Sequence, residues 1–367
     1  MEIPFFSFDK RNQDVREESI KAFEKFFDSK WYVLGNNTSE FEQNFARFNQ
    51  VQHAIGVSSG LDALHLSLLA LGIGKGDEVI VPSNTYIASV LSISFTGATP
   101  VFVEPRYETA NLNPELIKAA ITSKTKAIMP VHLYGQACEM DAIMAIAKEH
   151  GLYVVEDNAQ SQGALHNGRI TGSFGDINAT SFYPTKNLGA LGEAGAITTN
   201  SESLAQAVKS LRNYGSSERY YNEVKGYNNR IDEFEAAYLN IALNHLNSWN
   251  EERSFLAAEY QKRLKDVKRV ELFECAPGST SVNHLYVVKA SNRDALRKEL
   301  ADKGIGTQIH YPVPPHLQKA YSELGFKAGY LKIAEKLSQE VISLPLWLGM
   351  EVKMIDEVCR VIESSKS

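Results

Sequence analysis

The chain contains 367 residues, of which 44% are hydrophobic and 22% charged, and this predicts a soluble globular protein of about two domains. Its 38 basic and 44 acidic side chains leave a formal net charge of −6, which argues against a nucleic-acid-binding protein. The three cysteines, Cys138, Cys275 and Cys359, show no CxxC spacing, which argues against a disulfide framework or a zinc cluster.

The N-terminal residues read Met-Glu-Ile-Pro-Phe-Phe and contain no basic segment ahead of an apolar one, so they do not resemble a signal peptide. No apolar run approaches the roughly 20 residues that cross a bilayer. We therefore expect a cytoplasmic protein with no membrane partner.

Four short apolar segments in the first two thirds of the chain predict buried strands. They are residues 78–82, 99–103, 126–131 and 152–155. Between the last two, apolar residues at positions i, i+3, i+4 and i+7 predict a helix that starts near Met140. Strands separated by helices of this length form crossover units, so we expect an α/β fold with a mostly parallel central sheet.

A long helix is predicted over about residues 234–265, and a smaller α/β section follows it. Its predicted elements are a strand over 284–288, a helix over 294–303, a strand over 305–310 and a last helix that includes Ile355, Val358 and Ile362. We place a domain boundary near Leu246, which gives a large domain over 1–245 and a small one over 246–367. The proline-rich residues 311–316 predict a stiff loop.

The glycine-rich residues 72–76 match neither GxGxxG nor GxxxxGK[ST], so a dinucleotide or NTP site is not supported there. Small residues also precede the helix predicted to begin near Leu61. The free N–H groups and the dipole of a helix start can hold a phosphate, with Ser59 adding a hydroxyl and Gly60 allowing close approach. The same residues also suit an ordinary helix cap.

Two acids, Glu156 and Asp157, directly follow a predicted strand, where α/β proteins bind their ligands. Asp157 at this place suits a metal, a ribose, a protonated ring nitrogen or simply a cap. Lys186 lies in a turn-rich, sparsely charged loop over residues 181–189. This position is consistent with two roles for Lys186, a lysine that forms a Schiff base or an ordinary solvated lysine of a loop.

Taken together, a helix-start phosphate cradle, a strand-end Asp157 and Lys186 resemble a fold-type-I pyridoxal-phosphate (PLP) enzyme. PLP needs a carboxylate that keeps its ring nitrogen protonated and a lysine that reacts with its aldehyde. That lysine must also carry a proton between two carbons, so its pKa has to fall from the usual ~10.4, which desolvation in a tight loop favours.

Six motifs make the resemblance specific, and they occur in the order found in the DegT/DnrJ/EryC1/StrS family of sugar aminotransferases. They lie at residues 56–64, 82–86, 156–160 (Glu-Asp-Asn-Ala-Gln), 181–189, 226–232 (Gly-Tyr-Asn-Asn-Arg-Ile-Asp) and 310–318. The resemblance runs from Ile3 to the last helix. It implies that Lys186 is the Schiff-base and proton-shuttling lysine and that Asp157 pairs with the pyridinium nitrogen. The other cofactor contacts it implies are Tyr86 on the ring, Gln160 near the ring hydroxyl, Ser59, Gly60 and Ser181 at the phosphate, and Asn228 at the same phosphate from the neighbouring subunit.

The last motif, His-Tyr-Pro-Val-Pro-Pro-His-Leu-Gln, is similar to that of members that aminate C3 of a dTDP-linked 3-keto-6-deoxyhexose. The resemblance implies that His310 and Tyr311 contact the sugar or its pyrophosphate and that Tyr183 contacts the sugar. Arg219 suits the pyrophosphate, because two phosphates entering an acidic protein need a cation, and it equally suits an exposed position. A metal site at His310 and His316 is not expected, since no other ligand is evident.

We therefore expect a homodimeric PLP-dependent aminotransferase with shared active sites. It would move an amino group from L-glutamate to the C3 ketone and give a dTDP-3-amino-3,6-dideoxyhexose. C4 amination is the alternative reaction. Dehydration at C3 is disfavoured, because relatives with that activity hold histidine where this chain has Lys186. A regulatory protein on the same fold is a rival class. The C4 epimer, the nucleotide base and the donor stay open.

Overall fold

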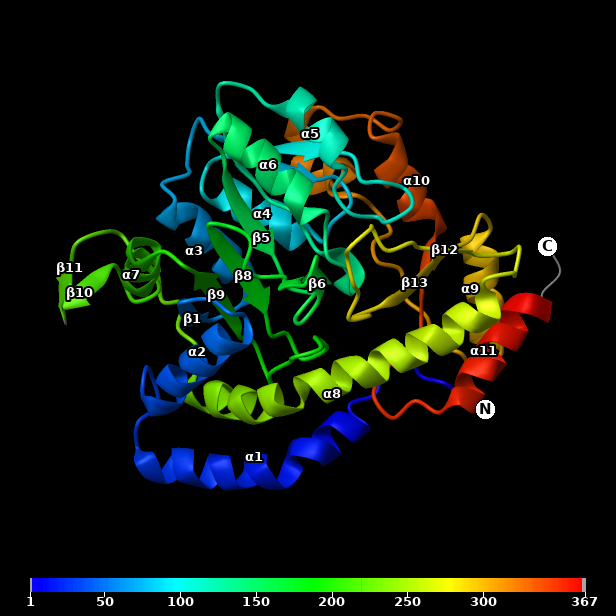
Figure 1. Ribbon diagram of the computed structural model, residues 1–367, viewed down its shortest axis with the longest axis horizontal. Coiled ribbons are helices and arrows are strands. Elements are labelled where there is room, and N and C mark those ends of the chain that lie inside the picture. The colour runs from blue at the N-terminus through cyan, green and yellow to red at the C-terminus, as the bar shows by residue number, and fades with distance from the viewer. Residues whose placement is uncertain (1, 219, 365–367) are drawn as a thin grey trace.

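The computed structural model describes residues 2–218 and 220–364 of the chain (Figure 1). At its centre is a seven-stranded sheet in which β9 runs antiparallel to both of its neighbours and the other pairs are parallel. In spatial order the strands are β1 (His53–Val57), β9 (Gly195–Thr199), β8 (Ile177–Ser181), β5 (Tyr153–Asp157), β4 (Thr125–Ile128), β2 (Glu78–Pro82) and β3 (Thr99–Val103). The predicted α/β fold with a mostly parallel sheet is confirmed.

Helices cover both faces of the sheet, because buried strands present apolar side chains alternately to the two faces. Val79 and Val81 of β2 pack against one group of helices, whereas Ile80 between them packs against another. The first group is α3 (Gly60–Ala70), α4 (Ile87–Phe95) and α7 (Glu202–Leu211), and the second is α5 (Pro114–Ala120) and α6 (Met140–His150). The sheet is therefore the middle of three layers.

The predicted strands of the large sheet agree closely with β2 and β3, whose bounds match residue by residue. β4 ends at Ile128, ahead of Pro130, because proline cannot donate to a strand ladder. β5 extends two residues further than predicted and ends at Asp157. This extension makes the aspartate the last residue of a buried strand.

The C-terminal part forms a three-stranded antiparallel sheet of β12 (Glu271–Leu272), β13 (Tyr286–Lys289) and β14 (Val341–Leu344). Around it lie α9 (Arg293–Asp302), α10 (Lys332–Glu340) and α11 (Val352–Ser364). The predicted strand over 305–310 is wrong. Ile305 bridges Ile3 and Gln308 bridges Ser343, so the segment has two different partners and forms no continuous ladder.

Helix α8 (Glu233–Leu264) crosses the molecule and links its two parts, as Figure 1 shows. Its first half packs with α1 (Asp9–Ser29) and α2 (Asn36–Phe48), and its second half packs with α9, β13, β14 and α11. Leu246 belongs to the first group and Leu256 to the second. We propose that this change of packing partner marks the boundary between domains 1–245 and 246–367.

The remaining elements are short. They are β6 (Leu165–His166), β7 (Arg169–Ile170), the hairpin of β10 (Ser216–Glu218) and β11 (Tyr221–Asn222), and the 3-10 turns Leu133–Gly135, Pro315–Leu317 and Lys319–Leu324. The proline-rich residues 311–316 form a loop that ends in the second of these turns, as predicted. In the described part of the chain, no helix combines the length and the apolar character needed to cross a bilayer.

Candidate active site

A cavity of about 580 Å³ opens at the carboxyl ends of the parallel strands, where ligands bind in sheets of this kind. Ten of the twelve residues predicted to form the site line it. They are Ser59, Gly60, Tyr86, Asp157, Gln160, Ser181, Tyr183, Lys186, His310 and Tyr311. The fold thus brings together residues that lie as much as 252 positions apart in the chain (Ser59 and Tyr311, 311 − 59).

Asp157 lies buried at the floor of the cavity, at the end of β5. Its carboxylate accepts hydrogen bonds from Oγ of Ser89 (2.7 Å) and from the backbone N–H of Ala159 (3.1 Å). Burial raises its pKa, while these hydrogen bonds and the charge of Lys186 act in the opposite direction. A cationic group placed against this carboxylate would relieve the desolvation penalty.

Glu156 points to the other face of β5, because neighbouring residues of a strand alternate. Its carboxylate accepts hydrogen bonds from the backbone N–H groups of Gly172, Phe174 and Gly175 and lies 2.8 Å from Nε2 of His132. The backbone N–H of Cys138 donates to Nδ1 of that histidine, so the ring proton lies on Nε2 and is donated to Glu156. Glu156 therefore anchors the loop that precedes β8 and is not among the residues lining the cavity.

Lys186 lies in a tight turn after β8, with its backbone N–H donated to the carbonyl oxygen of Tyr183 (2.8 Å). Burial lowers the pKa of Lys186 to about 8, against an opposing effect of Asp157. The buried Arg11 of α1 donates from Nη1 to the carbonyl oxygen of Pro184 (2.5 Å) and so fixes the turn from behind. At pH 7 roughly a tenth of a lysine with this pKa is neutral, about two hundred times the fraction expected for a free one.

The predicted phosphate cradle lies at the start of α3, next to the end of β8. A Cβ atom on Gly60 would stand 2.4 Å from Cβ of Ser181, so only glycine allows these two segments to approach. Ser59 caps the helix and accepts from the backbone N–H of Asp62 (3.1 Å). The hydroxyls of Ser58 and Ser59 both donate to the Asp62 carboxylate. A phosphate here would have to draw the Ser59 hydroxyl away from that carboxylate.

The opposite wall of the cavity comes from the C-terminal part of the chain. The Tyr311 ring lies 5.3 Å from that of Tyr86, and its hydroxyl accepts a hydrogen bond from Nε2 of Gln160 (3.2 Å). Nδ1 of His310 lies 2.8 Å from Oγ of Ser343. Burial, together with the charge of Lys186, lowers the pKa of His310 to about 4, so the ring is neutral at pH 7.

Asn228 is a predicted residue that is not among those lining this cavity. It is exposed and forms a backbone bridge with Asn213. Arg219 lies outside the described residues. Among the described residues that line the cavity, Lys186 is the only lysine and none is an arginine.

Sequence reasoning missed several residues of the site. Ser89 follows Tyr86 by three positions at the start of α4, a spacing that places both near one end of a helix and that could have indicated it. Glu193 and His284 also line the cavity, but no motif marks them. His316 pairs with Glu335 (3.2 Å) and not with His310, so these two histidines do not share a ligand.

The residues present fit PLP. A buried carboxylate stands ready for a protonated ring nitrogen, and a lysine whose pKa is lowered lies in the same cavity. Comparison with known proteins points the same way, since the model of the DegT/DnrJ/EryC1/StrS aminotransferase family matches residues 13–363. The chain belongs to this family. It is therefore an aminotransferase by descent as well as by the arrangement of its site.

Two relatives and one solved structure are similar to this aminotransferase over nearly its whole length. The dTDP-3-amino-3,6-dideoxy-alpha-D-galactopyranose transaminase of Aneurinibacillus thermoaerophilus is 48% identical, over 99% of this chain and 98% of the relative. The dTDP-3-amino-3,4,6-trideoxy-alpha-D-glucose transaminase of Streptomyces venezuelae is 46% identical, over 97% of this chain and 95% of the relative. The crystal structure of S. venezuelae DesV with a ketimine intermediate superposes with a TM-score of 0.97 at 46% identity and covers all of both chains.

Proposed function

We propose that this aminotransferase uses PLP to transfer an amino group from L-glutamate to the C3 ketone of a dTDP-linked 3-keto-6-deoxyhexose. The product would be a dTDP-3-amino-3,6-dideoxyhexose of either gluco or galacto configuration. The observation that carries the proposal is the meeting of Asp157 and Lys186 in one cavity, where the pKa of the lysine falls to about 8. The two relatives named above, both transaminases of dTDP-3-amino sugars, support the choice of substrate.

The cofactor would be held by residues from both sides of the cavity. When bound, PLP supplies an electron sink for the carbon that gains or loses the amino group. Asp157 would keep the ring nitrogen protonated, and Tyr86 would pack on the ring. Gln160 would lie near the ring hydroxyl. The start of α3, with Ser59, Gly60 and Ser181, would hold the phosphate through backbone N–H groups and hydroxyls.

Lys186 would carry the proton that moves during transfer. Its amine must be neutral to accept a proton and charged to give it back, so a pKa near 8 gives access to both forms at physiological pH. The turn that contains Lys186 is fixed by its own backbone hydrogen bond and by Arg11. The amine therefore stays in the cavity close to Asp157, the residue whose charge acts on its pKa.

The sugar would bind against the C-terminal wall. His310 is neutral at pH 7 and can donate or accept one hydrogen bond without attracting a counter-ion. Tyr311 and Tyr183 add hydroxyls at the same cavity. The pyrophosphate needs cations, and in the described lining of this chain none but Lys186 is a lysine or arginine. We propose that Arg219 supplies one.

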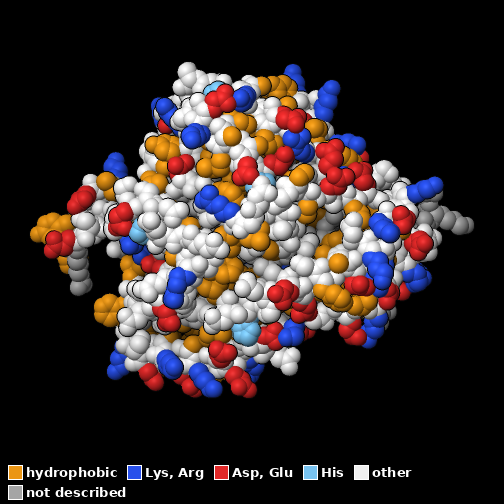
Figure 2. All heavy atoms as spheres, viewed as in Figure 1, with side chains coloured by type: hydrophobic (Ala, Val, Ile, Leu, Met, Phe, Trp, Pro, Cys, Tyr) orange, Lys and Arg blue, Asp and Glu red, His pale blue; other side chains and the backbone are white. Residues whose placement is uncertain are grey.

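We propose a homodimer in which Asn228 reaches the phosphate cradle of the neighbouring subunit. Its exposed position off its own cavity supports this. The nearby β10–β11 hairpin projects from the edge of the molecule, and Figure 2 shows hydrophobic side chains on it. Tyr221 (68% exposed) and Val224 (51%) contribute to this surface. Such a protruding apolar edge suits burial against a second copy.

Mixing inactive variants tests the shared site. Lys186→Ala and Asn228→Ala would each be inactive or weak alone, but a mixed dimer would contain one site with neither substitution. Co-refolding the two in equal amounts should restore about a quarter of the wild-type activity, since half of the dimers are mixed and half of their sites are intact. No recovery, with both variants folded and dimeric, would contradict shared sites.

The reaction itself is tested with 15N-labelled L-glutamate. We expect the sugar product to carry the label on C3, detected by NMR correlation of that nitrogen with the C3 proton. A label on C4 would favour the alternative reaction, amination of a 4-keto sugar. The Lys186→Ala variant is the control and should transfer no label. A wild-type enzyme that labels neither carbon would contradict the proposed function.

We also propose that the enzyme works in the cytoplasm. Cys138, Cys275 and Cys359 are free thiols in the structure, and a reducing compartment keeps such thiols free.

A further inference from the structure

Tyr134 lies outside the active-site cavity but touches both of its walls. It belongs to the 3-10 turn Leu133–Gly135 and adopts a left-handed backbone conformation, with φ of +61°. Such a conformation is unusual for an aromatic residue and persists only where the surroundings hold it. The next residue, Gly135, leaves no space for a side chain, because its Cβ would lie 2.7 Å from the backbone nitrogen of His284.

The backbone of Tyr134 fixes the cofactor side of the cavity. Its N–H donates to Oε1 of Gln160 (2.7 Å). Since a backbone N–H can only donate, the oxygen of that amide must face Tyr134 and its NH₂ group must face the cavity. There Nε2 donates to the hydroxyl of Tyr311 (3.2 Å). The orientation of Gln160 is therefore decided by Tyr134.

The side chain of Tyr134 fixes the opposite side. Its hydroxyl donates to the carbonyl oxygen of His310 (2.5 Å), in the segment that forms the C-terminal wall. The residue is only 6% exposed, and burial raises the pKa of the hydroxyl, which therefore keeps its proton.

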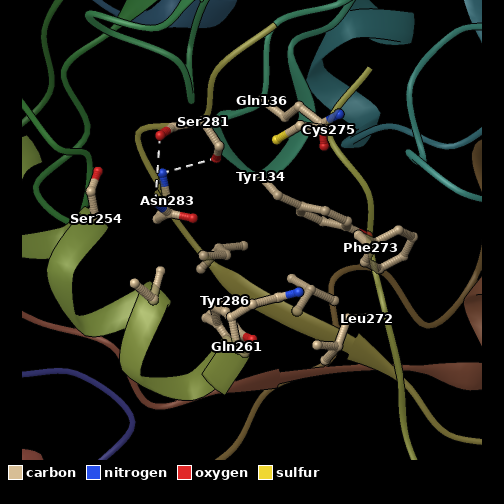
Figure 3. Close-up of a pocket in the computed structure, with 14 residues that line it drawn as sticks. Tyr134, Gln136, Ser254, Gln261, Leu272, Phe273, Cys275, Ser281, Asn283 and Tyr286 are labelled. Atoms are coloured by element: carbon tan, nitrogen blue, oxygen red, sulfur yellow. Dashed lines mark hydrogen bonds between the residues drawn. The ribbon is translucent and has the colours of Figure 1, made fainter. Parts of the chain in front are cut away.

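Tyr134 also lines a second cleft, of about 310 Å³ (Figure 3). The ring of Tyr134 lies in the wall of this cleft next to that of Phe273, with the ring centroids 5.8 Å apart. The two rings support each other, and Phe273 lies outside the lining of the active-site cavity. Phe273 is thus a neighbour that shares the packing of Tyr134 but not its hydrogen bonds to the active site.

We propose that Tyr134 is a positioning residue that holds the sugar-binding segment at His310 and Tyr311 in register with the cofactor-binding side at Gln160. The inference rests on the proposed function, because it assigns the segment at His310 to the sugar. Tyr134 acts through these residues and touches neither substrate nor cofactor. The hydrogen bond from its hydroxyl positions the segment that would bind the sugar. The hydrogen bond from its backbone N–H orients Gln160 and does not depend on the identity of the side chain.

The test is Tyr134→Phe, which removes the bond to His310 and keeps the ring and the backbone bond. We expect the KM for the keto sugar to rise about five- to tenfold, the effect of one lost hydrogen bond. The kcat should stay within about twofold, and the rate at which L-glutamate bleaches the cofactor band should not change. Phe273→Leu is the matched control, which disturbs the ring packing and should leave the KM alone. A general structural role for Tyr134 would slow both half-reactions together and would contradict the proposal.

Tyr311→Phe and the double variant complete a mutant cycle. If Tyr134 acts through the segment at residues 310 and 311, the two effects on KM will not add. Hydrogen exchange of the peptide over residues 306–318 gives a measurement that needs no substrate. It should be faster in Tyr134→Phe than in Phe273→Leu, and equal rates would overturn the inference. A wild-type enzyme that uses no keto sugar, with faster exchange in Tyr134→Phe, would instead contradict the proposed function alone.

Discussion

The two walls of the active-site cavity are built in different ways. On the sheet side, Asp157 and Ser181 lie at strand ends, and the backbone ladders of the sheet fix them. Lys186 lies in the turn after β8, which its own backbone hydrogen bond and Arg11 hold. On the C-terminal side, His310 and Tyr311 lie in an irregular segment. Hydrogen bonds from distant side chains hold that segment in place.

This difference separates chemistry from recognition. A residue at the end of a buried strand cannot move without disturbing the sheet, so it suits a group that must stay aligned with the cofactor. A segment held by a few side-chain bonds can change without unfolding the molecule. We therefore expect substitutions on the sheet side to remove turnover and substitutions on the C-terminal side to change substrate affinity.

The largest effect is expected for Lys186→Ala. It removes the group that we propose binds the cofactor covalently and moves the proton, so kcat should fall by about a thousandfold or more. Lys209→Ala is the control, because that lysine is exposed on α7 and lies outside the cavity. Steady-state kinetics of both variants checks this. Near-normal turnover by Lys186→Ala would show that another residue carries the proton.

A matched pair at the end of β5 gives the next effect. Asp157→Asn keeps the volume and the contact with Ser89 but loses the charge, and kcat should fall by about a hundredfold with little loss of stability. Glu156→Gln should instead leave kcat nearly unchanged and lower the stability. It places an NH₂ group among buried N–H donors, which should lower the free energy of unfolding by about 2–4 kcal/mol. Urea unfolding and steady-state kinetics of both variants measure these effects. If the two variants lost kcat and stability to the same extent, the different roles assigned to Asp157 and Glu156 would be wrong.

Lys186, to which we assign the proton transfer, should also lower the stability of the enzyme without cofactor. The pKa of Lys186 is about 8 in the folded chain and ~10.4 in an unfolded one, so the unfolded chain binds more protons between these values. The stability of the wild type therefore rises with pH across this window. Lys186→Met should be more stable below pH 8, by about 1–3 kcal/mol, and the gap should shrink toward pH 10. Urea unfolding at several pH values measures it, and a constant gap would argue against a lowered pKa.

The smallest effect is expected on the C-terminal wall. Ser343→Ala frees Nδ1 of His310 from its only side-chain partner on β14, so the ring becomes less well oriented. The KM for the keto sugar should rise about threefold with kcat unchanged, in line with one weak hydrogen bond. A selective fall in kcat would place His310 in the chemistry instead.

The sequence predicted the sheet side better than the C-terminal side, for a physical reason. The residues of the cofactor side lie in short motifs at strand ends and helix starts, where local rules apply. Ser89 was missed because its role depends on Asp157, a partner 68 residues away. The hydrogen bond between Tyr134 and His310 joins residues 176 positions apart, and no local sequence pattern predicts such a contact.

The one wrong strand has the same cause. Residues 305–310 have the apolar pattern of a strand, but a strand also needs a continuous partner. The fold places Ile3 beside one end of the segment and Ser343 beside the other. The small sheet instead uses β14, a strand that the sequence analysis did not predict.

The most direct test of the central claim is a visible absorbance scan of the purified protein with PLP, before and after addition of L-glutamate. We predict a yellow band that depends on Lys186 and that glutamate bleaches. Addition of the dTDP-linked 3-keto sugar should then restore it. A protein that stays colourless with added PLP would contradict the cofactor and with it the roles assigned to Lys186, Asp157 and Tyr86.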